Sequence, residues 1–391
     1  MTGACVMLVA AEASGDTLGA ALAVAIRERL GEAVRFVGVG GARMAALGIE
    51  SPFNIAPLST LGLLDGLAAY PLVLRRAAQT AELAVRERPD VAVLIDAWGF
   101  NLRVARRLRR IAGGPYLIKY VAPQVWATRP GRAATLARSV DQLLAIHAFD
   151  APMFERQGLP VRFVGNPALA LDFSAADPAG FRARLGAGPG DPILLVLPGS
   201  RPGEVDRLLA CFGDAVNRLK GARPGLFVVV AAGEMVAPAV KARVARWGER
   251  VLVIEGETAR LDAMRAATVA LACSGTVTTE LALAGCPMMV AYRLDMLSHL
   301  ILKRLIRTPY ITLFNVAAKA FVAPELIQER CNGPALAREI GLRLDDRNLR
   351  EAQIARQNVA LEIMRGGIAD PIGEAADAVM DALRRLGRGS L

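Results

Sequence analysis

Short apolar runs alternate with longer amphipathic stretches along the first half of the chain. Runs without a polar residue at every second position are typical of strands covered on both faces, as in a parallel sheet. Helices between such strands would give repeated βα units. We expect the first strand at 5–11 and the first helix at 17–30. Further strands are expected at 35–41, 90–96, 116–123, 142–149 and 161–167.

The pattern restarts after the segment 168–192, in which three prolines and several Gly and Asp residues indicate a linker. Two α/β halves of similar size predict two Rossmann-like domains facing a cleft, with ligands at the carboxyl ends of the strands. The expected domains are 1–168, 169–350 and a C-terminal segment 351–391. This segment is expected to hold one helix, at about 350–388, which either crosses back to the first domain or contributes to a possible homodimer. Strands of the second half are expected at 193–199, 226–233, 250–256, 269–275 and 287–293.

One stretch, STLGLLDGLAAYPLVLRR at 59–76, allows two interpretations. Apolar side chains beside arginines fit a segment that lies on an anionic bilayer, but the pattern alone favours an ordinary core helix. The candidate membrane contacts are Leu63, Leu64, Leu67, Tyr70, Leu72, Leu74, Arg75 and Arg76. No run reaches the ~18–20 apolar residues of a membrane span, and the N-terminus lacks a signal-peptide pattern. We therefore expect a cytoplasmic protein that is soluble or peripheral.

Composition narrows the function classes. The 391 residues are 53% hydrophobic and 21% charged, which suits two domains with large cores. The formal net charge of +10 indicates an anionic partner, or simply an Arg-rich composition. Two histidines and five scattered cysteines without a CxxC pair argue against a metal site and a disulfide framework. We expect free buried thiols and no metal or cofactor.

Two turns in the first half end predicted strands with polar residues. The first holds Glu12, Ser14, Gly15 and Asp16, which can bind phosphate or sugar oxygens at a helix start or simply cap that helix. The second begins at Asp96, which can act as a general base or as a helix N-cap. The turn after the first strand, at 12–16, is not GxGxxG, so a nicotinamide site is not indicated. The arginines that follow Asp96, at 103–110, form either a solvated helix face or a contact for an anion.

The second half places small residues and one fixed cation after its strands. Ser200 and Arg201 follow one strand, and Ser274, Gly275 and Thr276 follow another and open a helix. Helix N-termini and an arginine together fit a nucleotide diphosphate, because both stabilise phosphate charge. Glu280 lies one helical turn beyond Thr276 and can accept ribose hydroxyls. The chain has no Walker A lysine motif, which argues against ATP hydrolysis.

Seven stretches in this order resemble the lipid-A-disaccharide synthases: AAEASGDTLGA, RFVGVGGARM, LIDAWGFN, YVAPQVWA, LLVLPGSRPGEV, CSGTVTTELALAGCPMMVAYR and KRLIRTPYITLFN. The resemblance implies a metal-independent, inverting glycosyltransferase of the B fold. Its family reaction transfers diacylglucosamine from UDP-2,3-diacylglucosamine to 2,3-diacylglucosamine 1-phosphate (lipid X), giving a β-1,6 disaccharide phosphate and UDP. The implied place is the anionic inner-membrane surface on its cytoplasmic side, with no nucleic-acid partner. This favours the membrane interpretation of 59–76.

The resemblance also implies residue roles. Asp96 matches the family's essential aspartate and would be the base for the acceptor hydroxyl, while Arg201 matches the arginine on the UDP phosphates. The first loop, with Glu12, Ser14, Gly15 and Asp16, would lie near the acceptor. The implied nucleotide-sugar residues are Ser200, Arg201, Ser274, Gly275, Thr276, Glu280, Asn315 and Gln328.

The chain departs from the family pattern at Asn166, Gly99, Lys319 and Ala320. Asn166 stands where the family commonly has His, and an amide cannot titrate near neutrality. Three other functions therefore stay open. The chain can be a paralogue for another UDP-sugar or lipid acceptor, a UDP-GlcNAc epimerase-like enzyme, or a catalytically silent binding protein.

Overall fold

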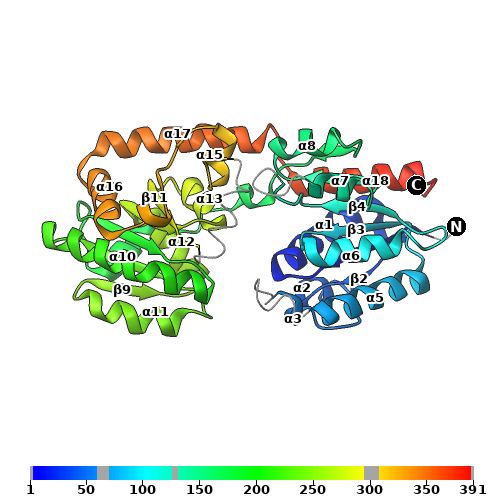
Figure 1. The fold of residues 1–391 in the computed structure, drawn as a ribbon, viewed down its shortest axis with the longest axis horizontal. Helices are drawn as coiled ribbons and strands as arrows, with labels where there is room; N and C mark the ends of the chain where they lie inside the picture. The colour runs from blue at the N-terminus through cyan, green and yellow to red at the C-terminus, as the bar shows by residue number, and fades with distance from the viewer. Residues whose placement is uncertain (1–2, 60–69, 126–130, 295–307, 389–391) are drawn as a thin grey trace. The chain divides into compact units, whose positions relative to one another are not determined.

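The computed structural model describes residues 3–59, 70–125, 131–294 and 308–388, and Figure 1 labels its elements. The chain forms two compact units. The first unit joins Met1–Pro167 to Gly366–Leu391, and the second is Ala168–Arg365. Among the described helices, none has both the length and the apolar content needed to cross a membrane.

The first unit contains a six-stranded parallel sheet in the order β2-β1-β3-β4-β5-β6. All six strands predicted in this half are confirmed, and each ends one to four residues before its predicted end because the chain turns there into a loop. The strands are β1 (Cys5–Ala10), β2 (Arg35–Val39), β3 (Val91–Ile95), β4 (Tyr116–Tyr120), β5 (Gln142–Ala145) and β6 (Val161–Phe163).

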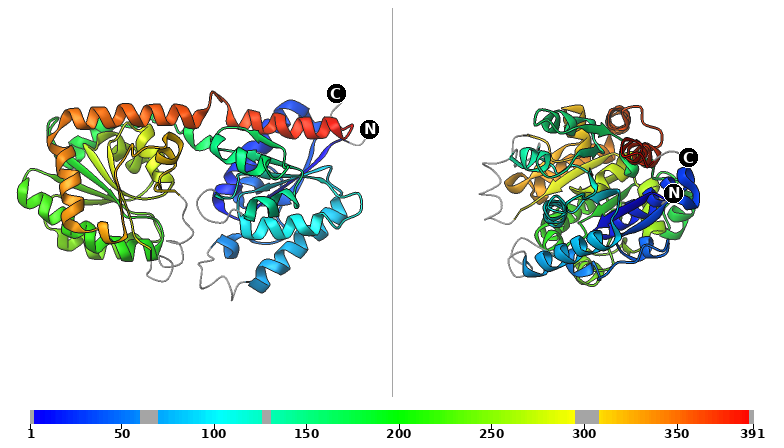
Figure 2. Two further views of the ribbon diagram at one scale, coloured as in Figure 1. Left: turned by 45° about the horizontal axis from the view of Figure 1, so that its top comes forward. Right: turned by 90° about the vertical axis from the view of Figure 1, so that its right-hand side faces the viewer.

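Both faces of this sheet are buried, which explains the uninterrupted apolar runs. In β1, Val6 and Leu8 enter one core, and Met7 and Val9 enter the other. The first core lies under α1 (Ala13–Leu30), α2 (Ala42–Ala45) and α18 (Pro371–Arg385), and the second under α5 (Tyr70–Glu87) and α6 (Trp98–Leu108). Figure 2 gives further views of these layers. The remaining described α-helices of this unit are α3 (Ala56–Ser59), α7 (Gly131–Ala137) and α8 (Ala151–Glu155).

The expected single helix at 350–388 is wrong, because the chain forms two helices there. The first, α17, covers Arg347–Arg365 in the second unit, and α18 packs against α1 in the first unit. Gly366 and Gly367 separate them with positive φ angles of 55° and 79°. This left-handed backbone, which glycine adopts without a steric penalty, ends α17.

The second unit contains another six-stranded parallel sheet, in the order β12-β11-β10-β7-β8-β9. Five of its strands were predicted. The sixth, β12, was missed because it is only three residues long and contains the charged Glu325. The strands are β7 (Ile193–Leu197), β8 (Phe227–Ala231), β9 (Val251–Ile254), β10 (Val269–Cys273), β11 (Met288–Tyr292) and β12 (Glu325–Ile327).

The predicted linker at 168–192 belongs to the second unit and contains a helix, α9 (Pro178–Leu185), that packs against α12. The Asp177 side chain accepts a hydrogen bond from Gly180 N, and Phe181 is buried in the core. Proline at the first turn is compatible with a helix, so its presence there did not indicate a loop. The other helices of this unit are α10 (Pro202–Ala222), α11 (Ala237–Val244), α12 (Glu257–Ala266), α13 (Thr276–Leu283), α15 (Leu313–Ala318), α16 (Gly333–Asp345) and α17.

Each sheet has one point at which the strand order reverses. In the first unit the chain moves from β1 to β2 on one side and then from β3 onward on the other side. In the second unit the same reversal lies between β7 and β10. Loops that leave neighbouring strands at such a point diverge to opposite faces of the sheet and leave a crevice for a ligand. The predicted chemistry follows these four strands.

Candidate active site

The first switch point brings together the turns after β1 and β3. Gly15 lies so close to β3 that an added Cβ would be 3.7 Å from the Ile95 carbonyl oxygen. Glu12 ends the loop after β1 and Asp96 follows β3 directly, and the fields of both carboxylates reach the ammonium of Lys119 on β4. The structure therefore gathers predicted residues from two turns at one sheet edge.

Asp96 and Ala97 form a left-handed turn, which we call the Asp96 turn. Their φ angles are 47° and 40°, a conformation that costs an L-residue free energy unless its surroundings fix it. The Asn101 side chain donates from Nδ2 to the Ile95 and Asp96 carbonyls, at 2.7 and 3.0 Å. The helix that follows has Ala97 at its N-cap, without a side-chain hydrogen bond. The N-cap alternative for Asp96 is therefore wrong, and its carboxylate is half-exposed.

The residues Ala13 to Asp16 are the first turn of α1, which begins four residues earlier than predicted. Ser14 is exposed, whereas Asp16 is 4% exposed. The Asp16 carboxylate accepts hydrogen bonds from the main-chain nitrogens of Gly41, Arg43 and Met44, at 2.7, 2.9 and 3.1 Å. It therefore joins the loop after β1 to the loop after β2, and Ser14 is the more accessible of the two side chains.

The second switch point brings together the turns after β7 and β10. Arg201 is the N-cap residue of α10, and its side chain is 80% exposed. Its Nη1 donates to Oε1 of Glu204 at 3.3 Å, and the Glu204 side chain is only 10% exposed. An added Cβ at Gly199 would be 3.5 Å from Sγ of Cys273, the last residue of β10. The exposed Arg201 and Ser200 thus lie at the same edge as the SGT turn at 274–276.

Glu280 lies on α13, the helix that opens at Thr276 after the N-cap residue Gly275. Ser274 is half-buried, and the two residues after it are exposed. The Glu280 carboxylate forms an ion pair with Arg260 of α12. Sequence reasoning did not identify Arg260, which fixes the orientation of a carboxylate expected to meet ribose.

Asn315 and Gln328 differ in what they offer a ligand. Asn315 is fully buried, and its amide bonds Val322 N, Ala323 N, the Ala323 carbonyl and the Glu325 carboxylate. Its Nδ2 donates two hydrogen bonds and its Oδ1 accepts two, all inside the unit, so Asn315 shapes its loop and its amide has no donor left for a ligand. Gln328 follows β12 with φ 55°, and its buried Nε2 has no partner among the described residues.

The positions that depart from the family pattern lie in different environments. Asn166 is 7% exposed and buried, whereas Gly99, Lys319 and Ala320 are exposed. Lys319 ends α15 in a left-handed conformation, and its carbonyl accepts a hydrogen bond from the Tyr310 hydroxyl at 2.6 Å. Three of the four changes therefore alter the surface of a unit and leave its core unchanged.

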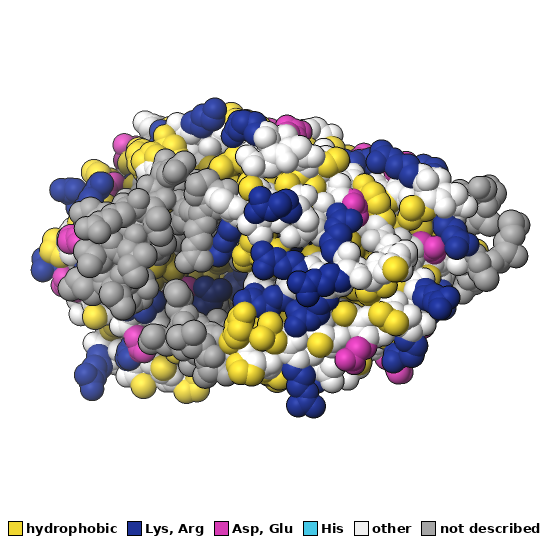
Figure 3. All heavy atoms as spheres, turned by 45° about the vertical axis from the view of Figure 1, so that its right-hand side comes forward, with side chains coloured by type: hydrophobic (Ala, Val, Ile, Leu, Met, Phe, Trp, Pro, Cys, Tyr) yellow, Lys and Arg dark blue, Asp and Glu magenta, His cyan; other side chains and the backbone are white. Residues whose placement is uncertain are grey.

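The predicted membrane contacts are only partly described. Leu63, Leu64 and Leu67 lie outside the described residues. Tyr70 and Arg75 of α5 are exposed, while Leu72, Leu74 and Arg76 are half-buried. The Arg103 guanidinium of α6 lies 4.8 Å from the centre of the Tyr70 ring. Figure 3 shows Lys and Arg side chains gathered among hydrophobic ones on the face that it draws.

Two buried titratable side chains follow β5 in the first unit. Burial lowers the pKa of His147 to about 4 and raises the pKa of Asp150 to about 8. Their Nδ1 and Oδ1 atoms have no hydrogen-bond partner among the described residues. Both groups are therefore mainly uncharged at neutral pH. Within the described ranges, no three His, Cys, Asp or Glu side chains are grouped as a metal site would require.

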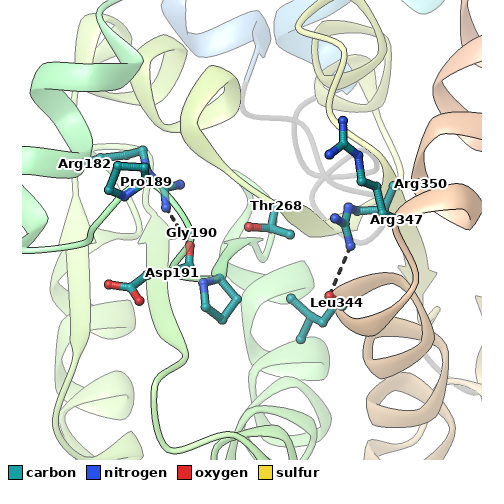
Figure 4. A pocket seen from close by; sticks show the side chains of 9 residues that line it. Arg182, Pro189, Gly190, Asp191, Thr268, Leu344, Arg347 and Arg350 are labelled. Carbon is teal, nitrogen blue, oxygen red and sulfur yellow. Dashed lines mark hydrogen bonds between the residues drawn. The ribbon is translucent and has the colours of Figure 1, made fainter.

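A pocket of about 430 Å³ lies in the second unit, at the opposite, amino-terminal edge of the sheet (Figure 4). Arg182 donates there to the carbonyls of Gly188, Asp191 and Ala266, and Arg350 donates to the Leu344 carbonyl. These guanidinium groups hold neighbouring chain segments in place. This pocket therefore lies away from the predicted residues of the second unit, which follow the carboxyl ends of its strands.

Comparison with known proteins finds relatives that match nearly the whole chain. The family model for lipid-A-disaccharide synthetase matches residues 6–371. The lipid-A-disaccharide synthase of Rhodospirillum centenum is 40% identical over 380 residues, covering 97% of this chain and 95% of the relative. That of Paramagnetospirillum magneticum is 40% identical over 382 residues, covering 97% and 98%.

Two solved structures share the fold. One is a UDP-GlcNAc 2-epimerase from Neisseria meningitidis bound to UDP-GlcNAc, with TM-score 0.62, 11% identity, and coverage of 97% of this chain and 100% of that one. The other is a glycosyltransferase from Rickettsia africae, with TM-score 0.58, 11% identity and 99% coverage of both chains. The predicted α/β architecture of glycosyltransferase B type is confirmed. With 40% identity to synthases across nearly its whole length, the chain belongs to the lipid-A-disaccharide synthase family.

Proposed function

We propose that this enzyme transfers 2,3-diacylglucosamine from UDP-2,3-diacylglucosamine to the 6-hydroxyl of 2,3-diacylglucosamine 1-phosphate. The observation that carries this proposal is the family match across residues 6–371. The geometry supports it, because one switch point offers a carboxylate and the other offers a fixed cation beside two helix starts. A glycosyl transfer from a nucleotide diphosphate needs both a base and a group that stabilises the departing charge.

The proposed reaction is a direct displacement. The acceptor 6-oxygen forms a bond to the anomeric carbon while the bond from that carbon to the β-phosphate oxygen breaks. The electron pair of the broken bond leaves with UDP, and the hydroxyl proton moves to the Asp96 carboxylate. Attack opposite the leaving group inverts the anomeric centre and gives the β-1,6 linkage.

The second unit would bind the nucleotide. Arg201 and the main-chain N–H groups that begin α10 and α13 would stabilise the diphosphate, through charge and helix dipoles. Glu280, oriented by Arg260, would accept hydrogen bonds from the ribose hydroxyls. The unpartnered Nε2 of Gln328 offers one further donor at the same edge of the sheet. Ser200, Ser274 and Thr276 complete the proposed nucleotide site.

The first unit would bind the lipid acceptor. Glu12 and the exposed Ser14 follow β1 beside the Asp96 turn, where they can contact sugar hydroxyls. Both substrates carry acyl chains that reside in a bilayer, so we propose peripheral binding to the anionic inner-membrane surface. The Tyr70–Arg103 pair and Arg75 support this proposal, because aromatic and basic side chains together favour an anionic interface.

Asp96→Asn tests the base directly. We expect kcat to fall by roughly 10²–10⁴-fold, as for loss of a general base, with UDP affinity nearly unchanged. The measurement is UDP release from UDP-2,3-diacylglucosamine with and without the monosaccharide 1-phosphate, together with calorimetric titration of UDP.

A matched control is Asp377→Asn, which removes a partly exposed carboxylate on α18 that pairs with Arg29. Such surface pairs contribute little, so activity should be retained. UDP release without the acceptor would contradict the transferase proposal. A collapse of UDP binding in Asp96→Asn would assign Asp96 a structural role.

A further inference from the structure

Lys119 is a charged residue inside an otherwise apolar parallel strand. It lies in β4, is 2% exposed, and faces no carboxylate at salt-bridge distance among the described residues. Placing an ammonium group in a protein interior costs several kcal/mol unless other groups solvate it. A side chain at this position therefore needs a specific set of partners.

The partners of Lys119 are three main-chain carbonyls at the switch point. Its Nζ donates to the Asp96 carbonyl at 2.6 Å, the Tyr120 carbonyl at 3.0 Å and the Leu94 carbonyl at 3.2 Å. An ammonium has three donors, so its hydrogen-bonding capacity is filled. The carbonyls belong to the end of β3, the Asp96 turn and the end of β4. One side chain thus contacts both strands at the point where the chain leaves β3 in the left-handed Asp96 turn.

The Asp96 turn is held from the other side by Asn101. Its Nδ2 donates to the Ile95 and Asp96 carbonyls, so the Asp96 carbonyl accepts from both Lys119 and Asn101. The Asp96 main-chain nitrogen also donates to the Tyr120 carbonyl at 2.9 Å. These contacts compensate a backbone with φ values of 47° and 40° in two non-glycine residues.

We propose that Lys119 is a positioning residue for the transfer reaction, whose buried ammonium fixes the left-handed Asp96 turn and so orients the carboxylate that accepts the acceptor proton. This inference rests on the proposed role of Asp96. Lys119 itself touches main-chain oxygens only, so it acts through Asp96 and not on substrate.

The protonation state of Lys119 makes the support of the Asp96 turn depend on pH. Burial lowers the pKa of Lys119 to about 8, although the negative fields of Asp96 and Glu12 oppose this. Below this value the charged group makes all three hydrogen bonds. As the pH rises through about 8, the proton leaves, one donor is lost, and the positive field beside Asp96 disappears. The wild-type kcat should therefore fall on the alkaline side of about 8.

Lys119→Met removes the donors and the charge while keeping a side chain of similar length. We expect kcat to fall about 10- to 100-fold, the size of effect that a small misplacement of a catalytic group produces. UDP affinity should stay unchanged, because the nucleotide site is in the other unit. The alkaline decrease of kcat should vanish. Lys119→Gln, which keeps two N–H donors but cannot titrate here, should give an intermediate kcat and no alkaline decrease.

Leu117→Ala is the matched control, because Leu117 is a fully buried residue of the same strand. It should lower Tm through a cavity and keep both kcat and the alkaline decrease. Assays run well below the Tm of each variant separate turnover from unfolding. An unchanged kcat or a persisting alkaline decrease in Lys119→Met would overturn the proposal, and so would an equal kcat loss in Leu117→Ala.

A crystal structure of Lys119→Met decides the positioning role without any activity measurement. We expect Asp96 and Ala97 to leave the left-handed region, and unchanged φ angles would overturn the proposal. If the wild-type enzyme transfers no sugar but the turn rearranges in the variant, the proposed function fails and the positioning role stands.

Discussion

At the scale of single residues, the proposed base and the proposed phosphate contact are both accessible, and buried neighbours hold them in place. Arg201 is 80% exposed and contacts Glu204, whose side chain is 10% exposed. Asp96 is half-exposed and extends from a backbone held by the buried Lys119 and Asn101. A side chain that must meet a ligand cannot be fixed by packing on all sides, so partners at its base orient it.

Arg201→Ala tests the proposed contact with the diphosphate. Hydrogen bonds to a charged group contribute about 1.5–3 kcal/mol, so UDP affinity should weaken roughly 10- to 100-fold. Arg201→Lys should weaken it less, because it keeps the charge and loses the planar pair of donors. Calorimetric titration with UDP measures both.

The control for this series is Arg218→Ala, which removes an exposed arginine of the same helix that pairs with Asp214. Its UDP affinity should equal that of the wild type. Equal affinities for UDP in the wild type and Arg201→Ala would exclude Arg201 from the nucleotide site.

Sequence patterns identified the exposed members of these pairs better than the buried ones. Arg201 and Asp96 were found because each is a charged residue in the turn after an apolar strand. A buried strand does not require a charge there, so a functional role was the natural interpretation. Lys119 was visible as a charge inside the run YLIKYVAP, but two of its three carbonyl partners, Leu94 and Asp96, lie 25 and 23 residues earlier in the chain. Conversely, Asp16 and Asn315 were expected near ligands, and the structure shows both of them bonded to main-chain groups of neighbouring loops.

At the scale of elements, α5 and α6 form a basic and aromatic surface on one face of the first sheet. On this surface the Arg103 guanidinium of α6 lies 4.8 Å from the centre of the Tyr70 ring of α5. A guanidinium over an aromatic ring keeps its charge available while the ring covers its apolar side. The two helices pack on each other, and the Tyr70–Arg103 pair links them at this surface.

The combined variant Tyr70→Ala, Arg75→Ala and Arg103→Ala tests whether this surface binds membranes. Each arginine near an anionic surface contributes about 1 kcal/mol, so partition onto vesicles should fall at least tenfold. Cosedimentation with phosphatidylglycerol-containing vesicles measures it, and neutral phosphatidylcholine vesicles give the baseline.

Two exposed arginines of the second unit, Arg338 and Arg347, supply the comparison. Replacing both by Ala removes the same charge and should reduce vesicle binding less. Equal losses in the two variants would mean that net charge, and not the α5–α6 surface, drives binding.

At the scale of the whole molecule, the first unit is built from two separate parts of the chain. Seven apolar residues of α18 enter the core beneath α1, and the chain reaches them only after completing the second unit. Arg162 of β6 also forms ion pairs with Glu374 and Asp381 of α18. The last helix is therefore part of the unit that contains Asp96.

Leu383→Ala should destabilise the first unit alone. Leu383 is fully buried, and such truncations cost about 2–5 kcal/mol of unfolding free energy. Hydrogen exchange should become faster in peptides from β1 to β4 and stay unchanged in those from β7 to β10. Val359→Ala on α17, where the side chain is 61% exposed, should change neither. Equal acceleration in both units would contradict this assignment.

The sequence by itself determined the described strands other than β12, the need to bury their apolar runs and the residue types that follow them. These features depend on local sequence pattern. An apolar run must be buried by other elements, and the polar residues of the turn after it can be read directly from the sequence. The family resemblance, carried by seven short stretches, followed from the same local information.

Only the tertiary structure decided which residues meet. It split the last helix in two and assigned α18 to the first core. It also placed β1 beside β3 and β7 beside β10, and paired Lys119 with the Asp96 turn. These contacts join residues far apart in the chain, and their free energy depends on the distance and burial that folding creates, which no local pattern encodes.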